Sequence, residues 1–253
     1  MSKPNSVRER GIYILPSLFT TAGLFAGFYG LIAAVQGRFE LAAWALIAAA
    51  IFDILDGRVA RLLHAESDFG AQYDSMCDML SFGIAPAVLM YMWALAPLHK
   101  AGWMAAFLLA AGAALRLARF NVQLDTQSKK YFNGLPTPGS AMLIATAVLF
   151  HEDAGLDPIA WLWFAISVAL AWLMVSNVPF FAGKDVDLKQ RKPAIILLVM
   201  LVAIAFVMTN PHTCLFILVL AYVIHGVLLG ITGRSRKDDG HSGGQPPVDE
   251  PAN

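Results

Sequence analysis

Four carboxylates lie close together in this chain, within two strongly apolar runs. Asp53 and Asp56 are three residues apart, and Asp74 and Asp78 are four residues apart. On a helix each pair shares one face, and two helices joined by a short connection can turn both pairs toward one another. Because a carboxylate inside a bilayer costs about 2.5–3.5 kcal/mol on insertion scales, four together need a compensating partner.

Divalent cations are the partner that best suits these carboxylates. A lone aspartate in a membrane often pairs with an arginine, and that structural explanation fits Asp53 or Asp56 taken singly. It explains four carboxylates poorly, whereas hard oxygen ligands suit Mg²⁺ or Mn²⁺. Two such ions about 3.5–4 Å apart can clamp a transferring phosphoryl group from both sides. We therefore predict a two-ion site with these ligands: Asp53, Asp56, Asp74 and Asp78.

Small and basic residues accompany the carboxylates. Gly57 and Gly70 have no side chain, so a nucleotide or another backbone can approach them closely. Ala60 is small and serves the same purpose. Arg61 can pair with a diphosphate or with a carboxylate. These four residues are therefore candidates for binding a nucleotide diphosphate.

The composition indicates an integral membrane protein. Hydrophobic residues make up 58% of the chain and charged residues only 14%, with a mean hydropathy of +0.61. Soluble domains are usually about 45–50% apolar. The formal net charge is zero, so nucleic acid is not expected as a partner. Cys77 and Cys214 lie far apart in apolar runs, so a disulfide framework is not expected.

The fold class predicted is all-α, a polytopic membrane protein of about eight transmembrane helices. Backbone groups in lipid must pair within their own segment, so the apolar runs are expected to be helices. One run, 138–151, is short for an upright crossing. The expected spans are 14–35, 41–63, 72–97, 101–120, 138–151, 158–180, 193–209 and 212–232.

The basic residues predict the orientation. With both termini in the cytoplasm, only Arg38 and Lys100 of the 18 lysines and arginines face outward. The carboxylates then lie at the cytoplasmic side of an inner membrane. Residues 1–233 are expected to form one transmembrane domain, and the polar tail 234–253 is expected to be disordered.

The spacing of the motif resembles the signature of the CDP-alcohol phosphotransferase family, Asp-x2-Asp-Gly-x2-Ala-Arg-x8-Gly-x3-Asp-x3-Asp. Every defined position matches, from Asp53 to Asp78. The resemblance implies that Asp53, Asp56 and Asp74 hold two metal ions and that Asp78 is the general base. It also implies that Gly57, Ala60, Arg61 and Gly70 contact a CDP-linked lipid.

Three further stretches resemble the membrane-embedded phosphatidylserine synthases of bacteria. They are 78–86, 116–121 and 132–138, and the resemblance covers most of 11–180. It implies transfer of a phosphatidyl group from CDP-diacylglycerol to L-serine, with release of CMP. The first helix departs from the pattern, because Ser17 and Gly23 stand where these enzymes commonly have asparagine. Thr20 and Thr21 remain as candidates for binding the CDP-diacylglycerol nucleotide.

Serine would need a cation for its carboxylate and polar groups for its remaining atoms. Arg116 and Arg119, at a cytoplasmic helix end, are the candidate carboxylate partners, and Asn121 and Asn133 can add polar contacts. The alternative is that the two arginines only anchor the helix end to lipid phosphates.

Other functions stay open at this stage. Within the family, the acceptor can be glycerol 3-phosphate, inositol phosphate or choline. A cation-coupled transporter would also use intramembrane carboxylates, but it predicts inverted repeats and acidic residues near the bilayer midplane. Separately, Gly23, Gly27 and Gly30 form a close-packing helix face, either within the subunit, which we favour, or at the contact of a homodimer.

Overall fold

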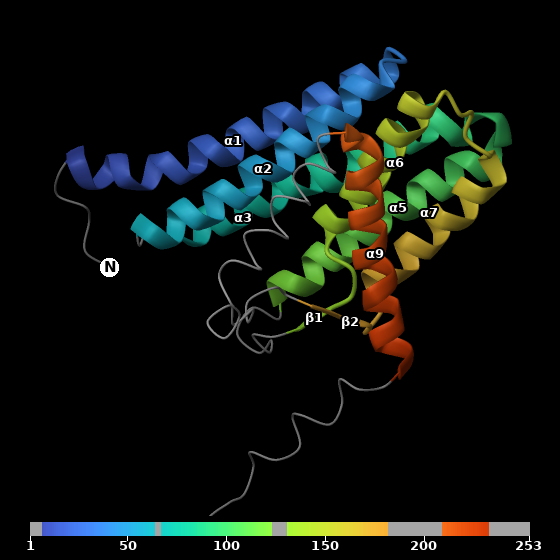
Figure 1. Cartoon of the computed structure of the whole chain (residues 1–253). Helices are drawn as coiled ribbons and strands as arrows, with labels where there is room; N and C mark the ends of the chain where they lie inside the picture. Colours follow the sequence, from blue (N-terminus) through green and yellow to red (C-terminus); the bar gives the residue numbers. More distant parts are fainter. Residues whose placement is uncertain (1–6, 64–66, 123–130, 182–208, 233–253) are drawn as a thin grey trace, which may run out of the picture.

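The computed structural model describes residues 7–63, 67–122, 131–181 and 209–232, and the described chain is almost entirely helical. Figure 1 shows the helices packed as a bundle. The regular helices are α1 (Val7–Val35), α2 (Phe39–Leu63), α3 (Asp68–Asp78), α4 (Ala85–Met90), α5 (Lys100–Val122), α6 (Thr137–Ala154), α7 (Ala160–Val175) and α9 (Pro211–Thr232).

Glycines allow α1 to pack closely against its neighbours. The helices α1 and α2 run side by side along most of their length (Figure 1). A Cβ at Gly30 would lie 3.2 Å from the Ala42 carbonyl oxygen, and one at Gly27 would lie 2.7 Å from the Ser81 Cα. The glycine face is therefore used within the subunit, which confirms the favoured alternative.

One continuous but irregular helical segment carries the second pair of carboxylates, Asp74 and Asp78. It runs from α3 through a π-helical segment η1 (Met79–Ile84), then α4, a second π-helical segment η2 (Tyr91–Leu95) and a 3₁₀ turn η3 (Ala96–Leu98). Ser67 caps its start, because its Oγ accepts the Gly70 N–H at 3.0 Å. Pro86 lacks a backbone N–H, which favours a change of hydrogen-bonding pattern just before it.

The core forms around α6. This helix contacts α2, α5, α7, α9 and η1. Its buried face is built from small and branched apolar side chains, with Ala141, Ala145 and Val148 fully enclosed. Such residues let several helices approach one central helix. The helix α2, with Asp53 and Asp56, and the segment η1, which follows Asp78, are thereby packed against α6.

The membrane character predicted from the sequence is confirmed. Within the described residues, four helical stretches are long and apolar enough to cross a bilayer: Leu15–Val35, Asp68–Leu98, Lys100–Val122 and Pro211–Gly230. Helices also occupy the expected spans 41–63 and 138–151. The expected span 193–209, except its last position, and the tail 234–253 lie outside the described residues, so the number of spans and the placement of the termini stay predictions.

A short two-stranded ribbon was not expected from the sequence. Strand β1 (Tyr131–Asn133) pairs antiparallel with β2 (Pro179–Phe181), with Phe132 opposite Phe180. The predicted span 158–180 was too long, because α7 ends at Val175. The next helical hydrogen bond would run to the Leu173 carbonyl, which accepts from the Ser176 hydroxyl at 2.8 Å and from the Leu135 N–H at 3.1 Å.

Candidate active site

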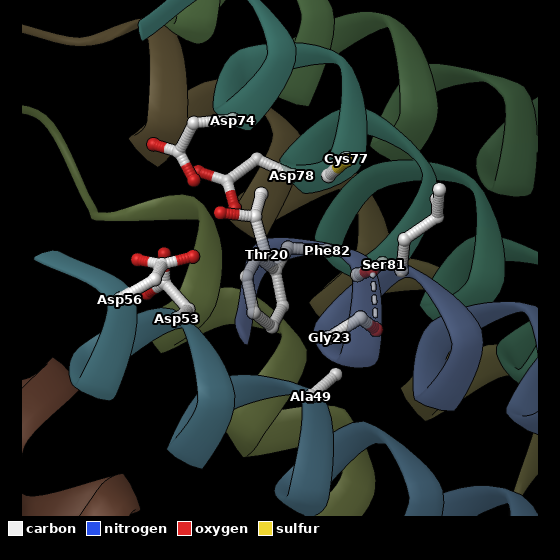
Figure 2. A pocket seen from close by; sticks show the side chains of 11 residues that line it. Thr20, Gly23, Ala49, Asp53, Asp56, Asp74, Cys77, Asp78, Ser81 and Phe82 are labelled. Carbon is white, nitrogen blue, oxygen red and sulfur yellow. Dashed lines mark hydrogen bonds between the residues drawn. The ribbon is translucent and has the colours of Figure 1, made fainter. Parts of the chain in front are cut away.

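The four motif carboxylates come from α2 and α3 and converge on one pocket (Figure 2). Asp53, Asp56 and Asp74 each offer an oxygen, and these three oxygens lie within 4.8 Å of one another. The pairs share a helix face because of their three- and four-residue spacing, and the contact of both helices with α1 brings the pairs together. Three oxygens at this separation can share a small cation.

The burial of Asp56 indicates which kind of ligand the cluster suits. Its side chain is only 6% exposed, and its Oδ2 atom has no hydrogen-bond partner among the described residues. A buried carboxylate oxygen without a donor is costly unless a cation neutralises it. An all-oxygen donor set with one unpaired buried oxygen fits Mg²⁺ or Mn²⁺. The residues present therefore fit the divalent ions predicted from the sequence.

Asp78 lies beside this trio rather than within it. It is the last residue of α3, and Figure 2 shows its carboxylate next to that of Asp74. The π-helical segment η1 begins at the following residue. Ser81, in η1, donates to the Gly23 carbonyl oxygen at 3.3 Å, which ties the segment to α1. The backbone that carries Asp78 is thus fixed on the side facing α1.

The two threonines of α1 have different positions. Thr20 is buried and lines the carboxylate pocket, and its hydroxyl donates to the Pro16 carbonyl at 3.1 Å. The Thr21 hydroxyl donates to the Ser17 carbonyl at 2.7 Å and lies 3.0 Å from the Tyr73 hydroxyl. Only Thr20 of this pair therefore lies at the pocket wall.

The two motif glycines also differ. A Cβ at Gly57 would meet only Nη2 of Arg61, 3.9 Å away, so a ligand can approach this backbone. Ala60 and Arg61 continue the same helix, half-buried and exposed respectively. A Cβ at Gly70 would lie 3.0 Å from the Ser67 Oγ that caps α3. Gly70 therefore makes room for the cap, a structural role that its motif position alone does not reveal.

Comparison with known proteins agrees with this geometry. A family model described as CDP-alcohol phosphatidyltransferase matches residues 13–175, from α1 to the end of α7. The chain belongs to this family. All four carboxylates of the pocket lie within the matched residues, so this site is the natural candidate for the active site of a CDP-alcohol phosphatidyltransferase.

Named relatives cover most of the chain. The CDP-diacylglycerol–serine O-phosphatidyltransferase of Helicobacter pylori is 32% identical over 86% of this chain and 91% of its own length. The protein of the same name from Mycobacterium leprae is 33% identical over 88% of this chain and 77% of its own length. The archaetidylserine synthase of Methanothermobacter thermautotrophicus is 32% identical over 70% of this chain and 73% of its own length.

Among the predicted acceptor residues Arg116, Arg119 and Asn121, Arg116 is the most deeply buried in this CDP-alcohol phosphatidyltransferase. Its side chain is only 9% exposed, and it interacts electrostatically with Asp78. One terminal nitrogen, Nη1, donates to the Thr137 hydroxyl at 3.1 Å. The buried Nε has no partner among the described residues. A buried guanidinium with an unused donor can bind an anionic group.

The other predicted acceptor residues make contacts within the protein. Arg119 donates to the carbonyl oxygens of Val175 at 3.2 Å and Ser176 at 3.5 Å, and also to the Asn177 side chain. It therefore caps the C-terminal end of α7, where a cation is favourable. Asn121 exchanges hydrogen bonds of 3.0 and 3.2 Å with Ser75. Asn133 lies in β1.

The pocket also contains residues that we did not single out from the sequence. Cys77, Ser81 and Phe82 follow Asp74 by three, seven and eight residues and line the same pocket. Residues at these intervals lie on the same side of a helix as Asp74. Continuing the helical spacing of the motif past Asp78 would therefore have predicted them. Tyr73, which pairs with Thr21, has no such signal, because its contact joins two distant helices.

Proposed function

We propose that this protein is a phosphatidylserine synthase, which transfers the phosphatidyl group of CDP-diacylglycerol to L-serine and releases CMP. The observation that carries the proposal is the convergence of three carboxylates on α2 and α3 beside a fourth, Asp78. Relatives with the corresponding name, aligned over most of the chain, support serine as the acceptor.

Asp53, Asp56 and Asp74 would hold two divalent ions, Mg²⁺ or Mn²⁺. When bound, these ions supply positive charge against the diphosphate of the lipid and its leaving CMP. The open side of Gly57 and the exposed guanidinium of Arg61 suit the nucleotide diphosphate, and Thr20 lines the carboxylate pocket. We place this site at the cytoplasmic face of the inner membrane, from the distribution of basic residues.

Asp78 and Arg116 would handle the acceptor. The Arg116 guanidinium binds the serine carboxylate, which turns the serine hydroxyl toward Asp78. Asp78 takes the hydroxyl proton, and the serine oxygen forms a bond to the phosphorus that carries diacylglycerol. The bond from this phosphorus to the bridging oxygen of the diphosphate breaks, and CMP leaves with that oxygen. Positioning and charge neutralisation supply most of the rate enhancement.

The direct test uses the purified protein with CDP-diacylglycerol and Mn²⁺. Serine, glycerol 3-phosphate, inositol phosphate and choline are each supplied as the only acceptor, and CMP release is followed. We expect release with serine and formation of phosphatidylserine, identified by mass spectrometry. Faster release with a phosphorylated alcohol would overturn serine as the acceptor while keeping the reaction class.

The phosphorylated acceptors are the second candidate because Arg116 would bind a phosphate as readily as a carboxylate. The acceptor series separates the two, since they compete for the same guanidinium. A cation-coupled transporter has less support, because the carboxylates belong to one helix pair in a matched transferase domain.

A further inference from the structure

The helix α3 carries Asp74 and Asp78 into the pocket (Figure 2) but has little apolar packing of its own. Among its residues only Cys77 is buried, whereas Phe69 and Met76 are 76% and 73% exposed. The helix packs mainly against α1 and against the segment η1 that follows it. Because its buried face is so narrow, apolar packing alone fixes the rotation of α3 about its own axis poorly.

The residue that precedes Asp74 is bonded to α1. The hydroxyl oxygens of Tyr73 and Thr21 lie 3.0 Å apart. Since the Thr21 hydroxyl gives its one hydrogen to the Ser17 carbonyl at 2.7 Å, Tyr73 is the donor of this bond. The ring of Phe69 stacks on that of Tyr73, with centroids 6.1 Å apart and planes only 4° from parallel. One side of α3 is therefore tied to α1 by a directed bond from a supported ring.

The residue that follows Asp74 is bonded to α5 instead. The Ser75 hydroxyl donates to Oδ1 of Asn121 at 3.2 Å, and Nδ2 of Asn121 donates back to the Ser75 hydroxyl oxygen at 3.0 Å. Both side chains are half-buried, so water competes little for these bonds. The opposite side of α3 is therefore tied to the last turn of α5.

These two ties lie on either side of Asp74. Successive residues on an α-helix point about 100° apart, so Tyr73 and Ser75 project to opposite sides of Asp74. A tie to α1 on one side and to α5 on the other opposes rotation in both directions. Side-chain ends lie about 5–6 Å from a helix axis, so a rotation of about 20° would move the Asp74 carboxylate by about 2 Å. Metal–ligand distances vary by only about 0.2 Å.

We propose that Tyr73 and Ser75 are positioning residues, which fix the rotation of α3 and so orient Asp74 toward the metal site. The inference rests on the proposed function, because it takes the carboxylate trio to bind divalent ions. Thr21 and Asn121 then act on the metal site through α3, in place of the substrate contacts expected from the sequence.

Binding of Mn²⁺ to the purified protein, without lipid or serine, tests the proposal directly. Electron paramagnetic resonance of the free ion gives the dissociation constant. Tyr73→Phe and Ser75→Ala each remove one tie, and we expect each to weaken Mn²⁺ binding about 10-fold. Ser75→Thr keeps the hydroxyl and should bind Mn²⁺ within about twofold of wild type.

The matched control for the tyrosine variant is Tyr91→Phe. Tyr91 is also half-buried, and it lies in η2, 18 residues further along the same helical segment. Its substitution removes the same hydroxyl group without touching either tie of α3. We expect this control to bind Mn²⁺ as wild type does.

Double variants show whether the two ties act separately. Thr21→Val added to Tyr73→Phe removes the other end of the same bond and should weaken Mn²⁺ binding no further. Asn121→Ala added to Tyr73→Phe removes both ties, and we expect a combined loss of about 100-fold. Saturating Mn²⁺ should draw Asp74 back into place, so kcat should recover while the KM for serine stays at its wild-type value.

Unchanged Mn²⁺ affinity in Tyr73→Phe or Ser75→Ala, or an equal loss in Tyr91→Phe, would overturn the proposal. An Asn121→Ala variant with a raised KM for serine and unaltered Mn²⁺ binding would also overturn it, because Asn121 would then serve the acceptor. A wild-type protein that binds no Mn²⁺ would reject the metal site of the proposed function and this inference with it. Weakened Mn²⁺ binding in the variants of a protein inactive with serine would keep the inference and reject only the proposed acceptor.

Discussion

The proposed donor and acceptor sides of the candidate site are held in place differently. The donor carboxylates sit on α2 and α3, and helical spacing within each element aligns them. The acceptor side gathers Arg116 from α5 and Thr137 from the start of α6. The loop before α6 is fixed in turn by the end of α7, where Gly134 donates to the Val178 carbonyl at 2.9 Å and Leu135 to the Leu173 carbonyl at 3.1 Å.

Because of this difference, the two sides should respond differently to substitution. Local helical geometry aligns the carboxylates within each donor pair, so substitutions there should affect chemistry and metal binding with little effect on the fold. Contacts between distant segments set the acceptor side, so a substitution there should affect stability or acceptor binding, according to which contact it removes. The following variants contrast the two sides, in order of decreasing expected effect.

Replacing the proposed base should have the largest effect. Asp78→Asn keeps the size of the side chain but removes the proton acceptor, so kcat should fall about 10²–10⁴-fold. The KM for CDP-diacylglycerol should change little. Asp68→Asn, an exposed change in the first turn of the same helix, is the matched control. Near wild-type turnover by the Asp78 variant would remove this residue as the base.

Removing a carboxylate from the trio should weaken metal binding. Asp56→Asn changes the buried ligand that carries the unpaired oxygen. We expect the apparent affinity for Mn²⁺ to fall at least about 10–100-fold. Titration of activity with Mn²⁺ after chelation measures the shift, and high Mn²⁺ should restore part of the rate. An unchanged Mn²⁺ requirement would contradict the assignment of Asp56 as a ligand.

The two arginines of α5 should separate acceptor binding from stability. Arg116→Lys loses the planar guanidinium, so the KM for serine should rise about 10–100-fold with CDP-diacylglycerol binding preserved. Arg119→Lys should leave the KM for serine unchanged and lower the Tm by about 2–4 °C, because it weakens the cap of α7. The reverse pattern would exchange the roles of the two residues.

Substitutions at two glycines, Gly134 and Gly57, should have the smallest effects, one on stability and the other on substrate binding. At Gly134, φ is +87° and a Cβ would lie 2.6 Å from the Met174 carbonyl, so Gly134→Ala should cost about 1–3 kcal/mol of stability. Gly57→Ala meets no such obstacle and should keep or raise the Tm. Its KM for CDP-diacylglycerol should nevertheless rise, because a methyl group would occupy the open approach. Unchanged kinetics would mean that the nucleotide binds elsewhere.

The sequence predicted the parts of the molecule that depend on local spacing. The helical segments from α1 to α6 follow from the apolar runs, and the pairing of Asp53 with Asp56 follows from the periodicity of one helix. The ribbon of β1 and β2 joins segments that are far apart, and three residues per strand leave almost no periodic signal. For the same reason the sequence could not distinguish Arg116 from Arg119, since their partners lie on different helices.

The unpaired oxygen of Asp56 has a consequence for the life of the protein in the cell. If the proposed divalent ions neutralise this buried oxygen, the folded state would be less stable when those ions are scarce. Metal binding to the native state then contributes directly to its thermodynamic stability. Newly inserted chains would mature fully only after loading, so ion supply would govern the abundance of the protein through its turnover by proteases.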